Sequence, residues 1–233
     1  MLEHLDARAH REFSDFTFRT LPSADLVAAD IDVIMALFEA NYREANRAYL
    51  ERSLGKLKYT TIATHARTPA AFALGEARVI DLPRLPAQIV TLAGICCVSP
   101  RFRRRGLFAE VEARSIRASD VALPPGRRFL TCGRMAHPAS FRLMARNPAV
   151  VPRPGAAPTE WHQAVGIAIA GAYGVPEFDA QTFVCKGTGV PIGYPVMEVD
   201  ATPEEWEMFR YVDRSRGDSL LGIAWAPDAP EGW

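Results

Sequence analysis

The residues from Gln88 to Val98 form an almost unbroken apolar run, QIVTLAGICCV, which restricts the fold more than any other part of the sequence. A strand whose side chains are apolar on both faces must be covered on both faces, as a central strand of a sheet is. Helical patterns on either side of the run can supply that cover. The sequence therefore predicts an α+β chain whose mixed sheet has this run at its centre.

The rest of the chain shows no internal repeat and no long linker, so we expect residues 1–233 to form a single domain. Helices are predicted where apolar residues recur at helical spacing, over residues 25–54, 107–122, 138–146, 159–172 and 204–214. Strands are predicted where β-forming residues cluster between turn signals, over residues 59–64, 71–80, 128–132, 182–186, 195–199 and 220–225. Four prolines predict a loop over residues 148–158.

Opposite charges balance in this chain, because Lys plus Arg and Asp plus Glu both total 27. The balance excludes a general electrostatic attraction to nucleic acid or to an anionic membrane, so any anion site must be local. No apolar run reaches the length that spans a bilayer, and the charged first 13 residues lack the apolar core of a secretory signal. We therefore expect a cytoplasmic protein that binds neither nucleic acid nor membrane.

The four cysteines, Cys96, Cys97, Cys132 and Cys185, include no CxxC pair. Cys96 and Cys97 would point to opposite faces of a strand, which does not favour a shared metal ion. We expect reduced thiols and no zinc site, since cytoplasmic thiols are kept reduced.

An arginine cluster follows the apolar run directly. Residues 98–108 read VSPRFRRRGLF, and four of the five residues from Arg101 to Arg105 are arginine. A strand that opens into a helix through such a turn presents unpaired backbone N–H groups, and the helix dipole adds positive potential there. Arginines are unfavourable at this end of a helix unless an anion offsets their charge, and Gly106 lets a ligand approach the backbone closely. The segment predicts a pyrophosphate site, with a solvated basic turn and an RNA-binding patch as alternatives.

The same segment resembles the acyl-CoA-binding motif of the GNAT superfamily of N-acyltransferases. In that motif a strand ends in Val-x-Pro, followed by an aromatic residue, an arginine, two variable residues, a glycine and an apolar residue. The matching positions here are Val98, Pro100, Phe102, Arg103, Gly106 and Leu107. The predicted order of helices and strands also fits the family over about residues 25–150.

The sequence departs from the family pattern in several places. Phe108 stands where a small residue is usual, and His137 stands where an Asn usually begins the short helix. Met144 stands where the family has the tyrosine that acts as general acid for the departing thiolate. The chain after Pro148 is also longer than a minimal member of the family requires.

The resemblance implies a mostly antiparallel sheet flanked by helices, with a V-shaped opening between two central strands for acetyl-CoA or another acyl-CoA. It implies that the backbone of residues 95–98 pairs with pantetheine and that one N–H group there polarises the thioester carbonyl. The residues expected to bind the cofactor are Cys97, Val98, Arg103, Arg104, Arg105, Gly106, Leu107 and Phe108. Residues 151–233 are expected to complete the sheet and the acceptor side, with Phe141 and Trp161 as apolar walls.

The implied reaction is direct attack of a small-molecule amine on the thioester, without a metal or a covalent enzyme intermediate. Cys96 and Cys97 are therefore interpreted as small buried strand residues. His137 is the candidate to assist the thiolate or to contact pantetheine, and a helix-capping or merely packed histidine before Pro138 is the alternative. The thiolate leaves readily without help, because the pKa of a free thiol is about 8.5. Glu76 and His65 are the candidates for the general base, and an ordinary surface role is the alternative for each.

Two other hypotheses stay open. Met144 in place of the family tyrosine favours a non-catalytic acyl-CoA sensor or regulatory domain. The arginine cluster would also suit an acidic acyl carrier protein as the acyl donor. The sequence leaves undecided the identity of the acceptor, the acyl-chain length and whether the chain forms a homodimer.

Overall fold

The computed structural model describes residues 13–122, 124–196 and 201–233. Its main sheet has eight strands in the order β1-β3-β4-β5-β6-β10-β8-β7, and a separate pair joins β2 to β9. The strands are β1 (Phe16–Pro22), β2 (Tyr42–Arg43), β3 (Tyr59–His65), β4 (Thr68–Leu82), β5 (Leu85–Val98), β6 (Phe129–Met135), β7 (Phe178–Asp179), β8 (Val184–Cys185), β9 (Tyr194–Pro195) and β10 (Ser219–Ala226). Among these strands only β5 and β6 pair in parallel.

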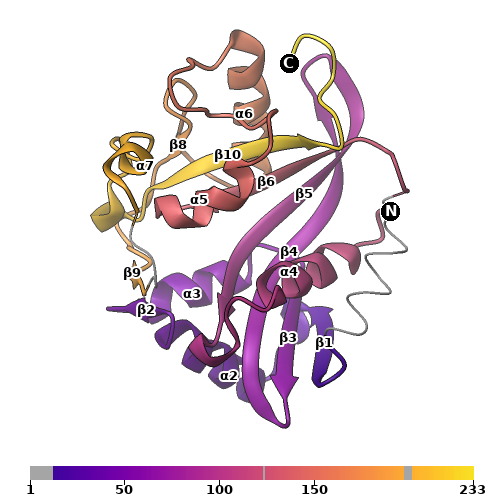
Figure 1. Cartoon of the computed structure of the whole chain (residues 1–233), viewed down its shortest axis with the longest axis vertical. Coiled ribbons are helices and arrows are strands. Elements are labelled where there is room, and N and C mark those ends of the chain that lie inside the picture. The colour runs from indigo at the N-terminus through magenta and orange to yellow at the C-terminus, as the bar shows by residue number, and fades with distance from the viewer. Residues whose placement is uncertain (1–12, 123, 197–200) are drawn as a thin grey trace.

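Helices cover the sheet (Figure 1), and the predicted α+β class with a mostly antiparallel sheet is confirmed. The helices are α2 (Ala28–Glu39), α3 (Arg47–Leu54), α4 (Leu107–Arg117), α5 (Pro138–Ala145), α6 (Glu160–Ala172) and α7 (Pro203–Glu207). In the described ranges, no helix combines the length and the apolar character that crossing a membrane requires.

Different helices pack on the two faces of the sheet. Along β4, Phe72 and Leu74 enter the apolar core that α2 and α3 share, whereas Ala71 and Ala73 enter a second core beneath α4. This alternation follows the period of two along a strand. The sheet therefore separates α4 from α2 and α3.

The apolar run predicted as a central strand lies within β5 and has neighbours on both edges, β4 and β6. Residues 89–92 are all buried, which means that successive side chains are covered on both faces of the sheet. The prediction from the run is confirmed.

The single helix predicted over residues 25–54 is wrong, because the chain breaks between α2 and α3. The Asn41 side chain donates a hydrogen bond to the carbonyl of Leu37 at 2.7 Å, and Glu44 takes a positive φ of 52°. Asn46 then caps α3 by accepting a hydrogen bond from the Tyr49 N–H at 3.3 Å. Asparagine side chains compete with helical backbone bonds in this way, and the apolar spacing hid that competition.

Other predicted elements are shorter in the structure. The helix predicted to residue 122 ends at Arg117, and Ser119 beyond it accepts a hydrogen bond from Ala77 N–H at 2.8 Å. The helix predicted over 204–214 is limited to α7, after which a turn buries Phe209 against Phe141. The strand predicted over 182–186 shrinks to β8. The strand predicted over 195–199 is represented by β9, and residues 197–199 lie outside the described residues.

Candidate active site

The two parallel strands β5 and β6 separate part way along their length. They pair from Val90 with Leu130 to Ala93 with Gly133, and beyond these pairs both strands continue without pairing to each other. Figure 1 shows β6 and β10 spreading away from β5. The predicted V-shaped opening is therefore present, with its apex at Ala93 and Gly133.

A β-bulge in β5 lies directly at this apex. The pairing of β5 with β4 passes from Ala93–Gly75 to Cys96–Ala73, so Gly94 and Ile95 together face a single residue of β4. A Cβ atom at Gly94 would lie 2.7 Å from Leu57 Cδ1 and 2.8 Å from Leu74 Cβ, so a side chain does not fit there. Bulges bend strands and expose backbone groups, which is the property an opening between strands needs.

Tyr173 enters the fork from the end of α6. Its hydroxyl group lies 2.9 Å from the carbonyl oxygens of both Ala93 and Cys132, one on each diverging strand. One hydroxyl proton serves one acceptor at a time, so the bond alternates between the two strands or is shared. Burial raises the pKa of Tyr173 well above its ordinary value, which keeps the hydroxyl protonated as a donor.

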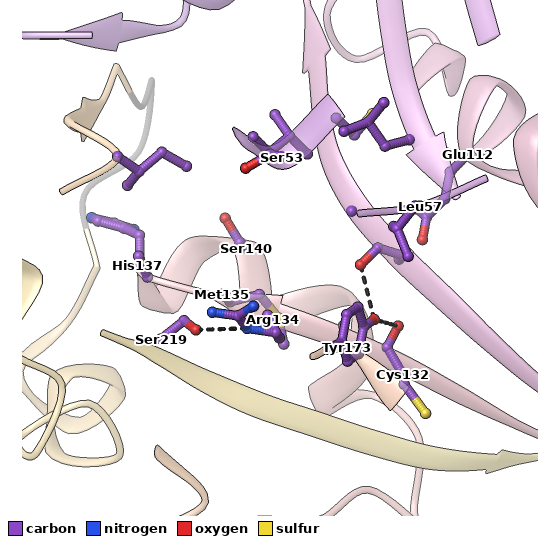
Figure 2. Close-up of a pocket in the computed structure, with 18 of the residues that line it drawn as sticks. Ser53, Leu57, Glu112, Cys132, Arg134, Met135, His137, Ser140, Tyr173 and Ser219 are labelled. Carbon is purple, nitrogen blue, oxygen red and sulfur yellow. Dashed lines mark hydrogen bonds between the residues drawn. The ribbon is translucent and has the colours of Figure 1, made fainter. Parts of the chain in front are cut away.

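A cavity of about 210 Å³ opens from this fork (Figure 2). Gly94, Ile95, Cys96, Phe108 and Glu112 line one side of it, and we call this set the β5 wall. Tyr49, Ser53, Lys56, Arg134 and Ser219 also line the cavity, and we call them the basic end. Met135, His137 and Met144 also line the cavity.

The arginine cluster lies at the N-terminal end of α4. Gly106 occupies the N-cap position with a φ of 76°, a conformation that favours glycine, and no described side chain caps the first turn. Arg104 and Arg105 are exposed, and the Arg105 guanidinium lies 5.1 Å from the Phe16 ring centre. Arg103 instead donates a hydrogen bond to Asn41 Oδ1 at 2.9 Å. Backbone N–H groups at an uncapped helix N-terminus are the kind that bind anions, and the pyrophosphate site stays a prediction.

The predicted cofactor-binding residues do not all reach the cavity. Among them, Phe108 lines it, whereas Leu107 is buried beneath α4. The side chains of Cys97 and Val98 are buried in the two cores, so these residues have only backbone groups to offer a ligand. Burial raises the pKa values of the Cys96 and Cys97 thiols, which agrees with their interpretation as unreactive strand residues.

His137 lines the cavity and also caps α5. Its Nδ1 atom accepts a hydrogen bond from the Ala139 N–H at 3.1 Å, which leaves Nε2 as the nitrogen that carries the proton. Its ring packs edge-on against Trp206, with 5.0 Å between ring centres. Met144, at the position of the family tyrosine, lies in the cavity wall close to Gly133. The structure thus brings both His137 and Met144 to the cavity, and the catalytic role expected of His137 stays a prediction.

The structure does not bring Glu76 or His65 to the cavity. Glu76 is buried, forms an ion pair with Arg78 and accepts a hydrogen bond from the Lys58 N–H at 3.3 Å. It therefore fixes the connection between α3 and β3. His65 packs between the rings of Phe16 and Phe102, at 5.1 and 5.2 Å from their centres.

Phe141 and Trp161, the expected apolar walls, do not line the cavity either. Phe141 is buried, and Trp161 packs edge-on against Trp233 and donates a hydrogen bond to the carbonyl of Pro83 at 2.8 Å. Both residues belong to the main apolar core.

Sequence reasoning missed Glu112, which lines the cavity from α4. Burial raises its pKa to about 7, so its carboxyl group exchanges protons near neutral pH. Figure 2 shows Glu112 and His137 on opposite sides of the cavity. A sequence signal existed, because Glu112 follows Phe108 by one helical turn and neighbours the buried Val111. A carboxylate beside the buried stripe of a helix could have been singled out on that basis.

The charged side chains of the basic end are Lys56 and Arg134. Arg134 Nε donates a hydrogen bond to Ser219 Oγ at 3.1 Å, and its guanidinium lies 5.9 Å from the Tyr173 ring centre. Partial burial, together with the nearby charges of Arg134 and Arg52, lowers the pKa of Lys56. The described residues hold no cluster of three His, Cys, Asp or Glu side chains that fits a metal ion.

The sequence matches no family model, and it matches no curated protein. Among solved structures, an aminoglycoside acetyltransferase from an uncultured soil metagenomic sample, in complex with sisomicin, is 13% identical with a TM-score of 0.31, covering 48% of this chain and 80% of that one. The aminoglycoside N-acetyltransferase AAC(6')-Iy in complex with CoA is 19% identical with a TM-score of 0.31, covering 46% and 77%.

The ribosomal-protein-S18-alanine N-acetyltransferase from Escherichia coli is 14% identical with a TM-score of 0.35, covering 93% of this chain and 99% of that one. Identities and scores this low assign neither an activity nor a substrate to this chain. The element order from α2 to α5 and the fork between β5 and β6 nevertheless agree with the fold that the resemblance of the motif implied.

Proposed function

We propose that this chain, with its GNAT-like fold, is an acyltransferase that moves an acetyl or other acyl group from acyl-CoA to a small-molecule amine. The observation that carries the proposal is the fork between β5 and β6, which opens beside an α4 helix that begins at an exposed, glycine-capped arginine turn. A thioester in the fork and a pyrophosphate at that turn would lie at the two ends of the pantetheine arm of one CoA molecule.

The backbone supplies most of the groups that would hold acyl-CoA. The N–H groups of residues 104–108 would bind the pyrophosphate, with Arg104 and Arg105 exposed beside them, whereas the Arg103 N–H donates to the carbonyl of Pro100 at 3.4 Å. The edge of β5 beyond Ala93 has no pairing with β6, so its peptide groups are available to pantetheine. One N–H group of that edge, directed at the thioester oxygen, would lower the barrier by about 3 kcal/mol.

Glu112 is the group we propose to accept the proton of the amine. In this scheme the amine nitrogen bonds to the thioester carbonyl carbon, the C–S bond breaks, and the nitrogen loses its proton to the carboxylate. CoA leaves as a thiolate, which needs little help because a free thiol has a pKa of about 8.5. A pKa of about 7 suits Glu112 to this task, since a base works best when its pKa lies near the working pH.

A non-catalytic acyl-CoA sensor is the second candidate, and Met144 favours it. Met144 lines the cavity where the family has its proton-donating tyrosine, and a thioether cannot donate a proton. The exposed Arg104 and Arg105 would also suit an acidic carrier protein as the donor, which is the third candidate.

Calorimetry with CoA tests the binding half of the proposal. Gly106→Val should weaken CoA binding, because a β-branched residue is strained at a φ of 76° and blocks access to the backbone. Arg103→Glu should weaken it too, by placing a negative charge beside the phosphates. Unchanged affinity for CoA in both folded variants would show that the phosphates do not bind at the arginine turn. In a separate experiment, competition by adenosine 3′,5′-bisphosphate would favour free CoA over a carrier protein as the acyl donor.

Thiol release from acetyl-CoA across a panel of amines tests the catalytic half. A catalyst should release CoA only when a suitable amine is present, and Met144→Tyr should raise its turnover several-fold. If neither the wild type nor Met144→Tyr transfers the acyl group while CoA still binds, the protein is a sensor.

A further inference from the structure

The charges along the cavity are divided between its two sides. Glu112 is the only Asp or Glu among the described residues that line it, and it lies on the β5 wall. Lys56 and Arg134 lie at the basic end, together with the hydroxyl-bearing residues Tyr49, Ser53 and Ser219. Ammonium, guanidinium and hydroxyl groups all donate hydrogen bonds, so a surface made of them is suited to bind an anion.

Arg134 has no carboxylate partner among the described residues. It donates to the neutral Ser219 hydroxyl at 3.1 Å, although a guanidinium has five N–H donors. Its other neighbours include the Tyr173 ring, the Tyr49 hydroxyl and the buried Cys185 thiol, and the second cation, Lys56, lies near enough to feel its charge. A half-buried guanidinium held among neutral groups is poorly compensated, so an incoming anion would be stabilised strongly.

Lys56 adds a second cation without an acidic partner among the described residues. It approaches from the segment after α3, whereas Arg134 approaches from the end of β6. Both residues also line an adjoining cavity of about 50 Å³, where Lys186 is neutralised by the buried Asp218 at 3.5 Å. The charge of Lys186 is thus neutralised by Asp218, whereas Arg134 and Lys56 face the cavity without a carboxylate partner among the described residues.

The phosphates of CoA do not account for these two cations. The arginine turn proposed for the pyrophosphate belongs to α4, which packs on one face of the sheet. Lys56 follows α3, which packs on the opposite face. The anion at the basic end must therefore belong to the other substrate.

We propose that the acceptor is an amine that also carries an anionic group, with a carboxylate as the best fit, and that Arg134 and Lys56 bind this group. This inference rests on the proposed acyltransferase function. A planar guanidinium matches a carboxylate with two parallel hydrogen bonds, which fixes the direction of the ligand as well as its position. A cavity of about 210 Å³ suits a small amino acid, whereas a polycationic amine would be repelled by Arg134 and Lys56.

Matched acceptors test the proposal in the intact 233-residue chain. L-amino acids and their C-terminal amides share the amine and differ in the carboxylate, and O-phosphoethanolamine and ethanolamine differ in a phosphate. The wild type should show kcat/KM about 10- to 100-fold higher for the charged member of a pair. This ratio corresponds to the free energy that a hydrogen bond to a charged group contributes. If only O-phosphoethanolamine is preferred over its uncharged partner, the anionic group of the acceptor is a phosphate rather than a carboxylate.

Arg134→Met and Lys56→Met should reduce this preference to less than about threefold by weakening transfer to the charged member only. Arg47→Met is the matched control, because Arg47 lies on α3, pairs with the exposed Glu51 and does not line the cavity. CoA binding measured by calorimetry shows that each variant is folded.

Equal kcat/KM for charged and uncharged acceptors in the wild type, or an unchanged preference in both variants, would overturn the inference while leaving the acyltransferase function standing. If no amine is acetylated, calorimetry of the same acids and amides decides the matter. Binding of the acids that Arg134→Met abolishes supports an anion site in a sensor, and absence of binding overturns the site as well.

Discussion

The β5 wall and the basic end of the cavity are assembled from the chain in different ways. The β5 wall comes from one stretch, residues 94–112, in which the bulge, the arginine turn and the first turns of α4 follow one another. The basic end combines Lys56, Arg134 and Ser219, which come from three separate regions of the sequence. A motif can encode the first kind of surface, whereas the second exists only after the sheet has formed. This difference explains why the sequence suggests a donor and is silent about the acceptor.

The largest effect should come from removing the one carboxylate of the β5 wall. Glu112→Gln should lower kcat/KM by about 100-fold, since a positioned proton acceptor contributes at least that much. In the wild type kcat/KM should rise with pH through about 7, as Glu112 loses its proton, and this limb should vanish in the variant. Glu110→Gln is the control, because Glu110 lies on the same helix, pairs with Arg114 and is absent from the cavity lining.

The same substitution predicts a change in stability. Burial raises the pKa of Glu112 in the folded protein, so the folded state holds this proton more tightly than the unfolded chain. The free energy of unfolding of the wild type should therefore fall as the pH rises from about 4.5 through about 7. Urea denaturation should show Glu112→Gln gaining stability relative to the wild type over this range, and parallel curves would contradict the buried carboxyl.

The bulge at the apex should tolerate no side chain. Gly94→Val should lower the free energy of unfolding by about 1–3 kcal/mol, because its Cβ would overlap Leu57 and Leu74. Gly171→Ala is the control in α6, where a Cβ atom meets nothing within 4 Å and helix propensity favours alanine. The free energies of unfolding of both variants, measured by urea denaturation, distinguish a steric conflict at Gly94 from a general cost of replacing a glycine. Equal stabilities would mean that the strands shift to admit the side chain.

The sequence predicted the central strand, the arginine turn and the amphipathic α4 because each depends on neighbours within a few residues. It did not predict the break after Glu39, where the side chain of Asn41 bonds to a carbonyl of α2. It also overlooked β1, which pairs along its whole length with β3, more than 35 residues later in the chain. Pairing between strands so far apart in the sequence depends on contacts that the local sequence pattern does not reveal.

The residues assigned to catalysis also fall into two groups, those that line the cavity and those that contact other parts of the fold. His137 and Met144 do line the cavity, and they were singled out from the helix that follows the strand after the motif. Glu76 was chosen for lying on a strand before the motif, yet its side chain bonds to the Lys58 N–H and pairs with Arg78. Spacing along a strand gives the face on which a side chain lies, and it does not reveal which neighbour the side chain will meet.

A smaller effect should follow from loosening the fork where the two sides of the cavity meet. Tyr173→Phe keeps the ring and removes the hydroxyl that lies between the carbonyls of Ala93 and Cys132. The free energy of unfolding should fall by about 1–2 kcal/mol, the cost of a buried hydrogen bond. Amide exchange should accelerate at residues 93–95 and 133–134 and stay unchanged in β3. Uniform acceleration throughout the sheet would contradict a local role at the apex.

The smallest effect should come from His137, which lines the cavity on the side opposite Glu112. Its Nδ1 atom accepts the Ala139 N–H, so the ring can offer only Nε2–H to a ligand, and loss of that proton from a neutral imidazole is unfavourable. We therefore expect the thiolate to leave without help from His137. His137→Ala should change kcat by less than about threefold, and it should lower the free energy of unfolding by about 0.5–1 kcal/mol through loss of the helix cap.

His137→Asn separates the two roles, because Asn caps helices well and is the usual family residue at this position. The Asn variant should regain the stability that the Ala variant loses, with the same kcat. A fall of about 100-fold in kcat in both variants, with an activity limb near the ordinary pKa of histidine, would instead identify His137 as the proton donor. The proton chemistry would then come from both sides of the cavity rather than from the β5 wall alone.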